Sequence, residues 1–222
     1  TDENWFNIPM MKLFADGVHL GHTAWMLDDY VDLPGSHGRS CFPGSTDEEQ
    51  AEELNKLIML AHQRGYQLGI HAIGDRAVAN SIEGIIKALC EYPGKNPRHF
   101  IIHGDSLATN AMARRAARYG IMMSVQPGLA EYLYEPSITC IGEKGRRMFG
   151  LRELWDTGIV LAGGTDSLSG EYGNWRKAIQ SAVTRRSAIT GEVHCPELAI
   201  SVAEGIKLFT YNGAYQEHFE LV

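Results

Sequence analysis

The segment FIIHGDS, residues 100–106, runs from apolar residues into a His-Gly-Asp sequence at His103, and GIHAIGD, residues 69–75, reaches His71 in a similar way. Each segment is short, apolar and followed by glycine, which is typical of a buried strand. If both strands belong to one parallel sheet, their carboxyl ends meet at the same edge. The two histidines are therefore predicted to lie close together.

Short apolar segments alternate with amphipathic helical segments along the chain. The strands are expected near residues 8–14, 67–72, 100–104, 121–126 and 159–166. The first helix has a clear start, a capping box at Thr46 and Glu49, and a stop at Gly65. This alternation predicts an α/β fold with parallel strands joined by right-handed crossovers.

The second half of the chain is expected to hold a loop and further helices. The stretch that contains YLYEP and GEKG is interpreted as a loop, because proline and glycine interrupt helices. A helix at LRELWDTG follows, and two more are expected near residues 173–189 and 196–210. There is no fixed-period repeat, low-complexity tract or linker, so residues 1–222 are predicted to form a single domain.

Composition narrows the functional classes. The chain has 222 residues, 44% of them hydrophobic, which favours a globular protein with a sizeable core. Its net charge of -7 argues against nucleic acid as a partner. No apolar run could span a membrane and the N-terminus does not resemble a signal peptide. The four cysteines form no CxxC pair, so reduced thiols and a cytoplasmic location are expected.

Four predicted strands end at or near a side chain that can titrate or bind a metal. These residues are Lys12, His71, His103 and Asp166. Alternation along a strand predicts that Gly69 and Ile101 share the inner face with the histidines that follow them. Two neutral imidazoles and a carboxylate suit zinc or a similar divalent ion. A lysine fits such a site only if carbamylation converts its ammonium into a carboxylate.

The motifs MKLFADG, IHAIGDRAV, IIHGDS, VQP and GTDS followed by AVTRR resemble, in this order, those of the amidohydrolase superfamily. The resemblance is to amidohydrolase family 3, which includes N-substituted formamide deformylase-like enzymes, and it runs from about Met11 to Arg186. It implies part of a (β/α)8 TIM-type barrel, strands 4 to 8 of the metal-dependent hydrolase fold. It also implies hydrolysis of a non-peptide carbon-nitrogen bond in a small-molecule substrate.

The resemblance assigns a role to each of the four strand-end residues. Lys12 would be the carboxylated lysine of strand 4, and His71 and His103 the metal ligands of strands 5 and 6. Asp166 would be the strand 8 aspartate, which binds metal, accepts a proton from the attacking water and passes it to the leaving nitrogen. The implied cofactor is Zn²⁺ or a similar divalent metal, as one or two ions.

The sequence departs from the family pattern at the first strand. The His-x-His pair of that strand is missing; His19 and His22 have a different spacing and lie in the loop after Lys12. Both loop histidines, with Gln126, are candidates for substrate binding. Strands 1 to 3 and the small β-sandwich domain are also expected to be absent. The apolar faces left open would favour association between chains, a possible homo-oligomer.

Several alternatives remain open from the sequence. Either histidine could be a core residue bonded to backbone, and Asp166 could cap a helix. Lys12 could form a Schiff base in a lyase. The chain could also be a truncated, non-catalytic family member. Arg185 and Arg186 are interpreted as salt-bridged surface charges on a helix.

Overall fold

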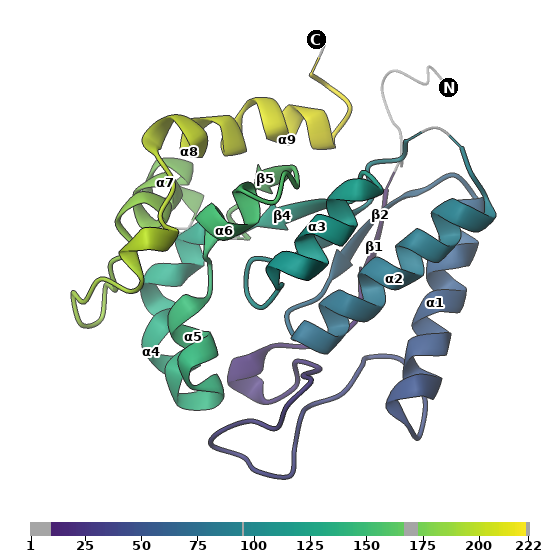
Figure 1. Cartoon of the computed structure of the whole chain (residues 1–222), viewed down its shortest axis with the longest axis horizontal. Coiled ribbons are helices and arrows are strands. Elements are labelled where there is room, and N and C mark those ends of the chain that lie inside the picture. Colours follow the sequence, from purple (N-terminus) through teal and green to yellow (C-terminus); the bar gives the residue numbers. More distant parts are fainter. Residues whose placement is uncertain (1–9, 95, 167–172, 221–222) are drawn as a thin grey trace.

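A five-stranded parallel sheet forms the centre of the computed structural model, which describes residues 10–94, 96–166 and 173–220 (Figure 1). The strands pair in chain order and are β1 (Met10–Phe14), β2 (Gln67–His71), β3 (Phe100–Ile102), β4 (Met122–Val125) and β5 (Leu161–Gly163). Every neighbouring pair is parallel. The prediction of an α/β fold with parallel strands is confirmed. The first predicted strand begins at residue 8, and residues 8 and 9 lie outside the described residues.

Helices follow the strands and cover one face of the sheet (Figure 1). They are α1 (Asp47–Gln63), α2 (Asp75–Glu91), α3 (Asn110–Arg118), α4 (Ala130–Ile141), α5 (Glu143–Arg147), α6 (Leu151–Trp155), α7 (Trp175–Thr184), α8 (Val202–Phe209) and α9 (Tyr211–Gln216). Short 3₁₀ helices among the described residues include η1 (His19–Gly21), η2 (Pro127–Leu129) and η4 (Pro196–Leu198). No helix among the described residues is long and apolar enough to cross a membrane.

Two parts of the secondary-structure prediction are wrong. The expected loop with YLYEP and GEKG is α4 and α5. The helix continues through Pro136 because one face, including Tyr134 and Cys140, is buried in an apolar cluster, and this tertiary packing outweighs the local proline signal. The helix expected at 196–210 is divided, because Ser201 caps a new helix through a capping box with Glu204.

The start of α1 follows the sequence prediction in part. The Thr46 hydroxyl accepts a hydrogen bond from the backbone N–H of Glu49 at 3.2 Å. The Glu49 carboxylate accepts from the N–H of Ser45 at 2.6 Å, one residue earlier than a capping box requires. Both contacts satisfy backbone donors at the helix entrance, so the start of α1 is fixed by local sequence.

The two faces of the sheet pack differently. Side chains such as Ile70, Ile101 and Val125 belong to the main core, which the helices cover. On the opposite face, Phe100 and Met122 form a smaller apolar cluster. Alternate residues of each strand supply the two faces, as the pleat of a strand requires.

The C-terminal helix α9 holds the amino ends of the central strands. The carbonyl of Gln216 accepts a hydrogen bond from the Gln67 side chain at 2.9 Å, at the start of β2. Arg98, which precedes β3, forms an ion pair with Glu220 at 2.6 Å. Since α9 covers the amino ends, the opposite end, where the strands finish, is left to the loops that follow them.

The face of β1 that carries Lys12 is open. Lys12 is exposed and the Phe14 side chain, on the same face, is 51% exposed. This open sheet face is the surface at which the sequence predicts association between chains. The oligomeric state itself stays a prediction.

The buried His99, which contacts the partly exposed His62 of α1, makes stability depend on pH. Burial, together with the charge of His62, lowers the pKa of His99 from 6.5 to about 3. His99 accepts a hydrogen bond from the N–H of Leu68 at 2.9 Å. The unfolded chain therefore binds a proton on this residue at a higher pH than the folded chain does, and stability is lost as pH falls from about 6.5 toward 3.

We expect the His99→Asn variant to lose less stability on acidification than the parent, because Asn can accept the same backbone hydrogen bond and does not titrate. The difference in slope should be up to about 1.4 kcal/mol per pH unit. Urea unfolding at about pH 7 and about pH 5 measures it. His218→Asn, at an exposed site, should keep the parental slope. Equal slopes for the parent and His99→Asn would contradict this assignment.

Candidate metal centre

The register of the first two strands places Lys12, Phe14 and His71 on one face of the sheet. Phe14 pairs with His71, and Lys12 pairs with Gly69. Lys12 Nζ lies 4.6 Å from the centroid of the Phe14 ring, and this ring lies 5.0 Å from that of His71. The prediction that Gly69 and His71 share the inner face agrees with this register.

The His103 side chain lies on the same face of the sheet, but its backbone conformation, and not strand alternation, places it there. Ile101 packs in the main core on the helical side, so the prediction that it shares the inner face with His103 is wrong. Strand alternation alone would therefore direct His103 into the helical layer. The residue instead has a positive φ of 67°, in the left-handed region that non-glycine residues rarely adopt. This conformation ends the strand and lets the imidazole lie beside that of His71.

The structure brings the four predicted strand-end residues together. The imidazole rings of His71 and His103 are 4.8 Å apart and nearly perpendicular. His103 Nε2 lies 3.7 Å from an Asp166 carboxylate oxygen. The charge of Lys12 is close enough to lower the pKa of both imidazoles. Asp166 also has a positive φ, of 50°, so two residues of the cluster have conformations often found at functional sites.

Burial keeps both imidazoles neutral near pH 7. It is the main cause that lowers the pKa of His103 from 6.5 to about 4, followed by the neighbouring His71. Burial also lowers the pKa of His71. The carboxylate of Asp166 opposes these effects at both residues. A neutral imidazole keeps a lone pair for a metal ion, whereas a protonated one cannot be a ligand.

One backbone contact selects the tautomer of His71. Its Nε2 lies 3.1 Å from the carbonyl oxygen of Gly17, which can only accept a hydrogen bond. Nε2 must therefore carry the proton, and Nδ1 of the neutral ring has the free lone pair. At metal sites, a backbone carbonyl commonly accepts a hydrogen bond from the ring nitrogen that does not bind the metal and so orients the histidine.

Asp16 is a buried carboxylate that the sequence analysis missed. Its side chain accepts hydrogen bonds from the N–H groups of Trp25, Ile73 and Gly74 at 2.9, 3.1 and 2.8 Å. One of its oxygens lies 3.8 Å from His71 Nε2. Burial raises the pKa of Asp16 to about 7, and the three backbone donors oppose this. The sequence feature that could have identified Asp16 is the Ala-Asp-Gly sequence directly after the strand that carries Lys12.

Asp105 is a second carboxylate close to a strand end, two residues after His103. It is buried, and one of its oxygens accepts a hydrogen bond from the backbone N–H of Gln126 at 3.1 Å. The side chain of Gln126 donates to the Ser124 hydroxyl at 3.1 Å and lies close enough to His103 to favour its protonated form. Gln126, predicted to bind substrate, is thus at the edge of the cluster.

The two loop histidines lie elsewhere. His19 is buried, with Nε2 2.7 Å from the hydroxyl of Ser137 in α4. His22 Nε2 lies 2.8 Å from an oxygen of Asp32. Within residues 10–94, 96–166 and 173–220, no hydrogen bond or ring contact joins either histidine to His71 or His103. Their role in substrate binding stays a prediction.

The interpretation of Arg185 as a surface charge is wrong. It ends α7 with a positive φ of 47° and is only 1% exposed. Its guanidinium donates to the carbonyl oxygens of His194 and Phe149, both at 2.6 Å. The chain packs around this cation because backbone carbonyls, rather than a carboxylate, satisfy its donors.

Comparison with known proteins identifies the family of this chain. The model of the Amidohydrolase family matches residues 1–221. This chain belongs to that family. The prediction from the sequence motifs is therefore confirmed.

Individual relatives agree with this assignment. The amidohydrolase-family chain is 33% identical over 208 residues to YtcJ of Bacillus subtilis (strain 168), a protein named as an amidohydrolase, and the match covers 92% of this chain. It is 31% identical over 124 residues to Protein LONG AFTER FAR-RED 3 of Arabidopsis thaliana, a match that covers 55% of this chain.

The fold is also found in solved structures. A chain from Pyrococcus furiosus, described as an uncharacterized metal-dependent hydrolase, superposes with a TM-score of 0.75 over 95% of this chain at 24% identity. The predicted fold, part of a TIM-type barrel, is confirmed by this likeness and by the parallel sheet. The chain spans 37% of YtcJ, 20% of the Arabidopsis protein and 40% of the Pyrococcus chain.

We expect the Asp16→Asn variant to lose about 1–3 kcal/mol of unfolding free energy, because the amide has only one acceptor oxygen and leaves a buried N–H unpaired. Chemical denaturation measures this loss. Asp28→Asn, at an exposed carboxylate that pairs with Lys144, should have little effect. An Asp16→Asn protein as stable as the parent would show that the buried hydrogen bonds do not hold the β1 and β2 ends together.

Proposed function

We propose that the strand-end cluster binds a divalent metal ion, with Zn²⁺ as the first candidate, and serves a hydrolase reaction on an amide-like carbon-nitrogen bond. The proposed ligands are Lys12 in its carboxylated form, His71, His103 and Asp166. The proposal depends on one observation: the ring centroids of the buried His71 and His103, which lie at the ends of adjacent strands, are 4.8 Å apart. Membership of the amidohydrolase family supports the type of reaction.

The donor set fits a divalent ion. His71 offers Nδ1, because its Nε2 faces the Gly17 carbonyl, and both histidines have lowered pKa values. Asp166 adds a carboxylate whose side chain is 52% exposed, on the side that a substrate would approach. Lys12 joins this set if its ammonium group first loses a proton, and the resulting amine nitrogen then forms a bond to the carbon of CO₂ and releases a second proton. The product is a carbamate, which carries a negative charge in place of the positive one.

A bound divalent ion would lower the pKa of a water molecule and polarise the substrate carbonyl. The residues of this chain supply the remaining parts of the reaction. Asp166 accepts the proton of the attacking water and gives it to the leaving nitrogen. Gln126, close to His103, is proposed to donate a hydrogen bond to the substrate. Gly17 and Asp16 hold the His71 ring in its orientation.

The Schiff-base alternative has less support. A lysine that forms a Schiff base near pH 7 is usually desolvated, which lowers its pKa. Lys12 is exposed and lies over the Phe14 ring, open to solvent. The structure therefore favours the metal-dependent reaction over the lyase.

We expect the His103→Ala variant to lose the Zn²⁺ bound at the strand-end cluster, about one equivalent per chain, because one of the two imidazole ligands is removed. The metal content of the purified chain, measured by inductively coupled plasma mass spectrometry, checks this. His218→Ala removes an exposed histidine and should keep the parental content. Unchanged metal in His103→Ala would show that this residue is not a ligand.

The Asp166→Asn variant tests the proton transfer separately from metal binding. The amide keeps an oxygen as a ligand but cannot accept a proton, so kcat should fall by about 10²-fold or more. Turnover of a series of N-acyl and N-formyl amines by the metal-loaded chain measures it. Loss of turnover together with the metal of the strand-end cluster would instead assign Asp166 mainly to ligation.

A further inference from the structure

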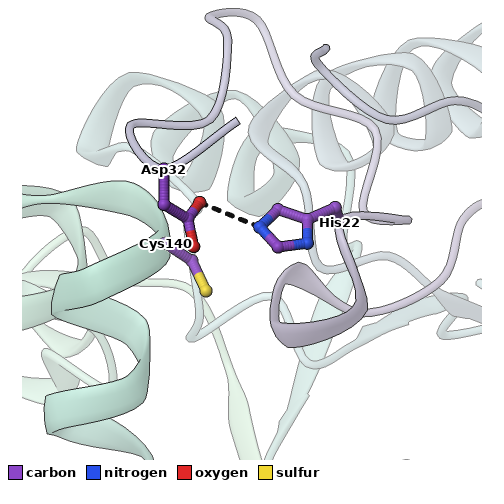
Figure 2. Close-up of side chains that lie close together, drawn as sticks. All are labelled: His22, Asp32 and Cys140. Carbon is purple, nitrogen blue, oxygen red and sulfur yellow. Dashed lines mark hydrogen bonds and ion pairs between the residues drawn. The ribbon is translucent and has the colours of Figure 1, made fainter. Parts of the chain in front are cut away.

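A second cluster of side chains that can bind a metal lies between the loop after β1 and α4, apart from the strand-end cluster. Figure 2 shows the three side chains close together: His22 and Asp32 from the loop, and Cys140 from α4. One ligand atom from each residue lies within 4.8 Å of the other two. The His22 Nε2 and an Asp32 oxygen are 2.8 Å apart. The cluster combines nitrogen, oxygen and sulfur donors.

Backbone and aromatic contacts position the three side chains. His22 ends η1 in a left-handed conformation, with φ of 52°. The N–H of Val31, next to Asp32, donates to the Cys140 carbonyl at 2.9 Å and joins the loop to the end of α4. The Tyr30 ring packs against His22 at 4.8 Å, edge to face, and its hydroxyl donates to the Ala24 carbonyl at 2.8 Å. The arrangement is thus built by tertiary contacts rather than by one flexible loop.

We propose that His22, Asp32 and Cys140 bind a Zn²⁺ ion that fastens the loop after β1 to α4. A thiolate, a carboxylate and a neutral imidazole are all ligands of Zn²⁺, which prefers four tetrahedral positions. Three come from the protein, and solvent can supply the fourth because the His22 and Asp32 side chains are each 30% exposed. Cys140 is 6% exposed, so its sulfur would bind the ion from the buried side of the site.

Charge and protons balance in this complex. The thiol releases its proton on binding, and the proton of the neutral imidazole moves to Nδ1, so that Nε2 can face the metal. The thiolate and the carboxylate then neutralise the two positive charges of the ion. The hydrogen bond between His22 and Asp32 is replaced by two bonds to the metal.

The site is chemically distinct from the proposed catalytic centre. The strand-end cluster contains no cysteine, so a sulfur ligand identifies the new site independently of any activity. None of the three residues belongs to the motifs that carry the family resemblance. Binding here would hold His19, three residues before His22, in its buried position against Ser137.

Titration of the chain with Co²⁺, which takes the same ligands as Zn²⁺, tests the proposal. We expect a near-ultraviolet sulfur-to-cobalt absorption band that saturates at one equivalent and disappears when Zn²⁺ is added. The His71→Ala/His103→Ala double variant should keep this band. The absence of the band in the parental chain, or its loss in the double variant, would overturn the proposal.

Single variants assign the ligands. Cys140→Ser should abolish the band, whereas the matched control Cys41→Ser, at an exposed cysteine, should keep it. Asp32→Asn should weaken Co²⁺ binding by about tenfold or more without removing the sulfur. Circular dichroism shows whether each variant is folded. If Cys140→Ser does not fold, an unchanged cobalt affinity in Asp32→Asn would still overturn the proposal, and a band that survives in a folded Cys140→Ser would do the same.

Discussion

The parallel pairing of five strands is the constraint on which the rest of this structure depends. Because every strand runs in the same direction, residues that are up to 154 positions apart in sequence, such as Lys12 and Asp166, are brought to one edge of the sheet. The pairing continues past the strand ends: the N–H of His103 donates to the Ser124 carbonyl, and that of Ala15 to the His71 carbonyl. The loops therefore leave the sheet from fixed points.

Burial then decides the chemical state of the side chains at that edge. His71 and His103 are removed from water and lie beside each other, so the protonated form of each is disfavoured. The same desolvation acts on Asp16 and Asp105 in the opposite direction and raises their pKa values to about 7. Burying these groups costs free energy, and the hydrogen bonds from backbone N–H groups offset part of that cost. An arrangement of this kind is typical of functional sites.

The loop after β1 connects the two proposed metal sites. Asp16 and Gly17 at its start contact the segments around His71, and His22 and Asp32 further along approach Cys140. A metal ion at the second site would restrict the same loop that orients His71. The proposed catalytic centre and the proposed structural site would then be coupled through about fifteen residues of backbone, without sharing a ligand.

The sequence by itself determined the alternation of strands and helices, the family, and the residue types at the strand ends, because these depend on local hydrophobic patterns and short motifs. Tertiary packing decided the rest. Alternation assigned Ile101 and His103 to one face, whereas the positive φ of His103, which pairing with β4 holds in place, turns its ring toward His71. Pro136 indicated a loop, but the burial of Tyr134 keeps α4 helical. The sequence motifs did not single out Asp16, and Arg185 was interpreted as a surface charge. Only the three-dimensional fold shows that backbone N–H groups surround Asp16 and carbonyls surround Arg185, because those partners come from distant parts of the chain.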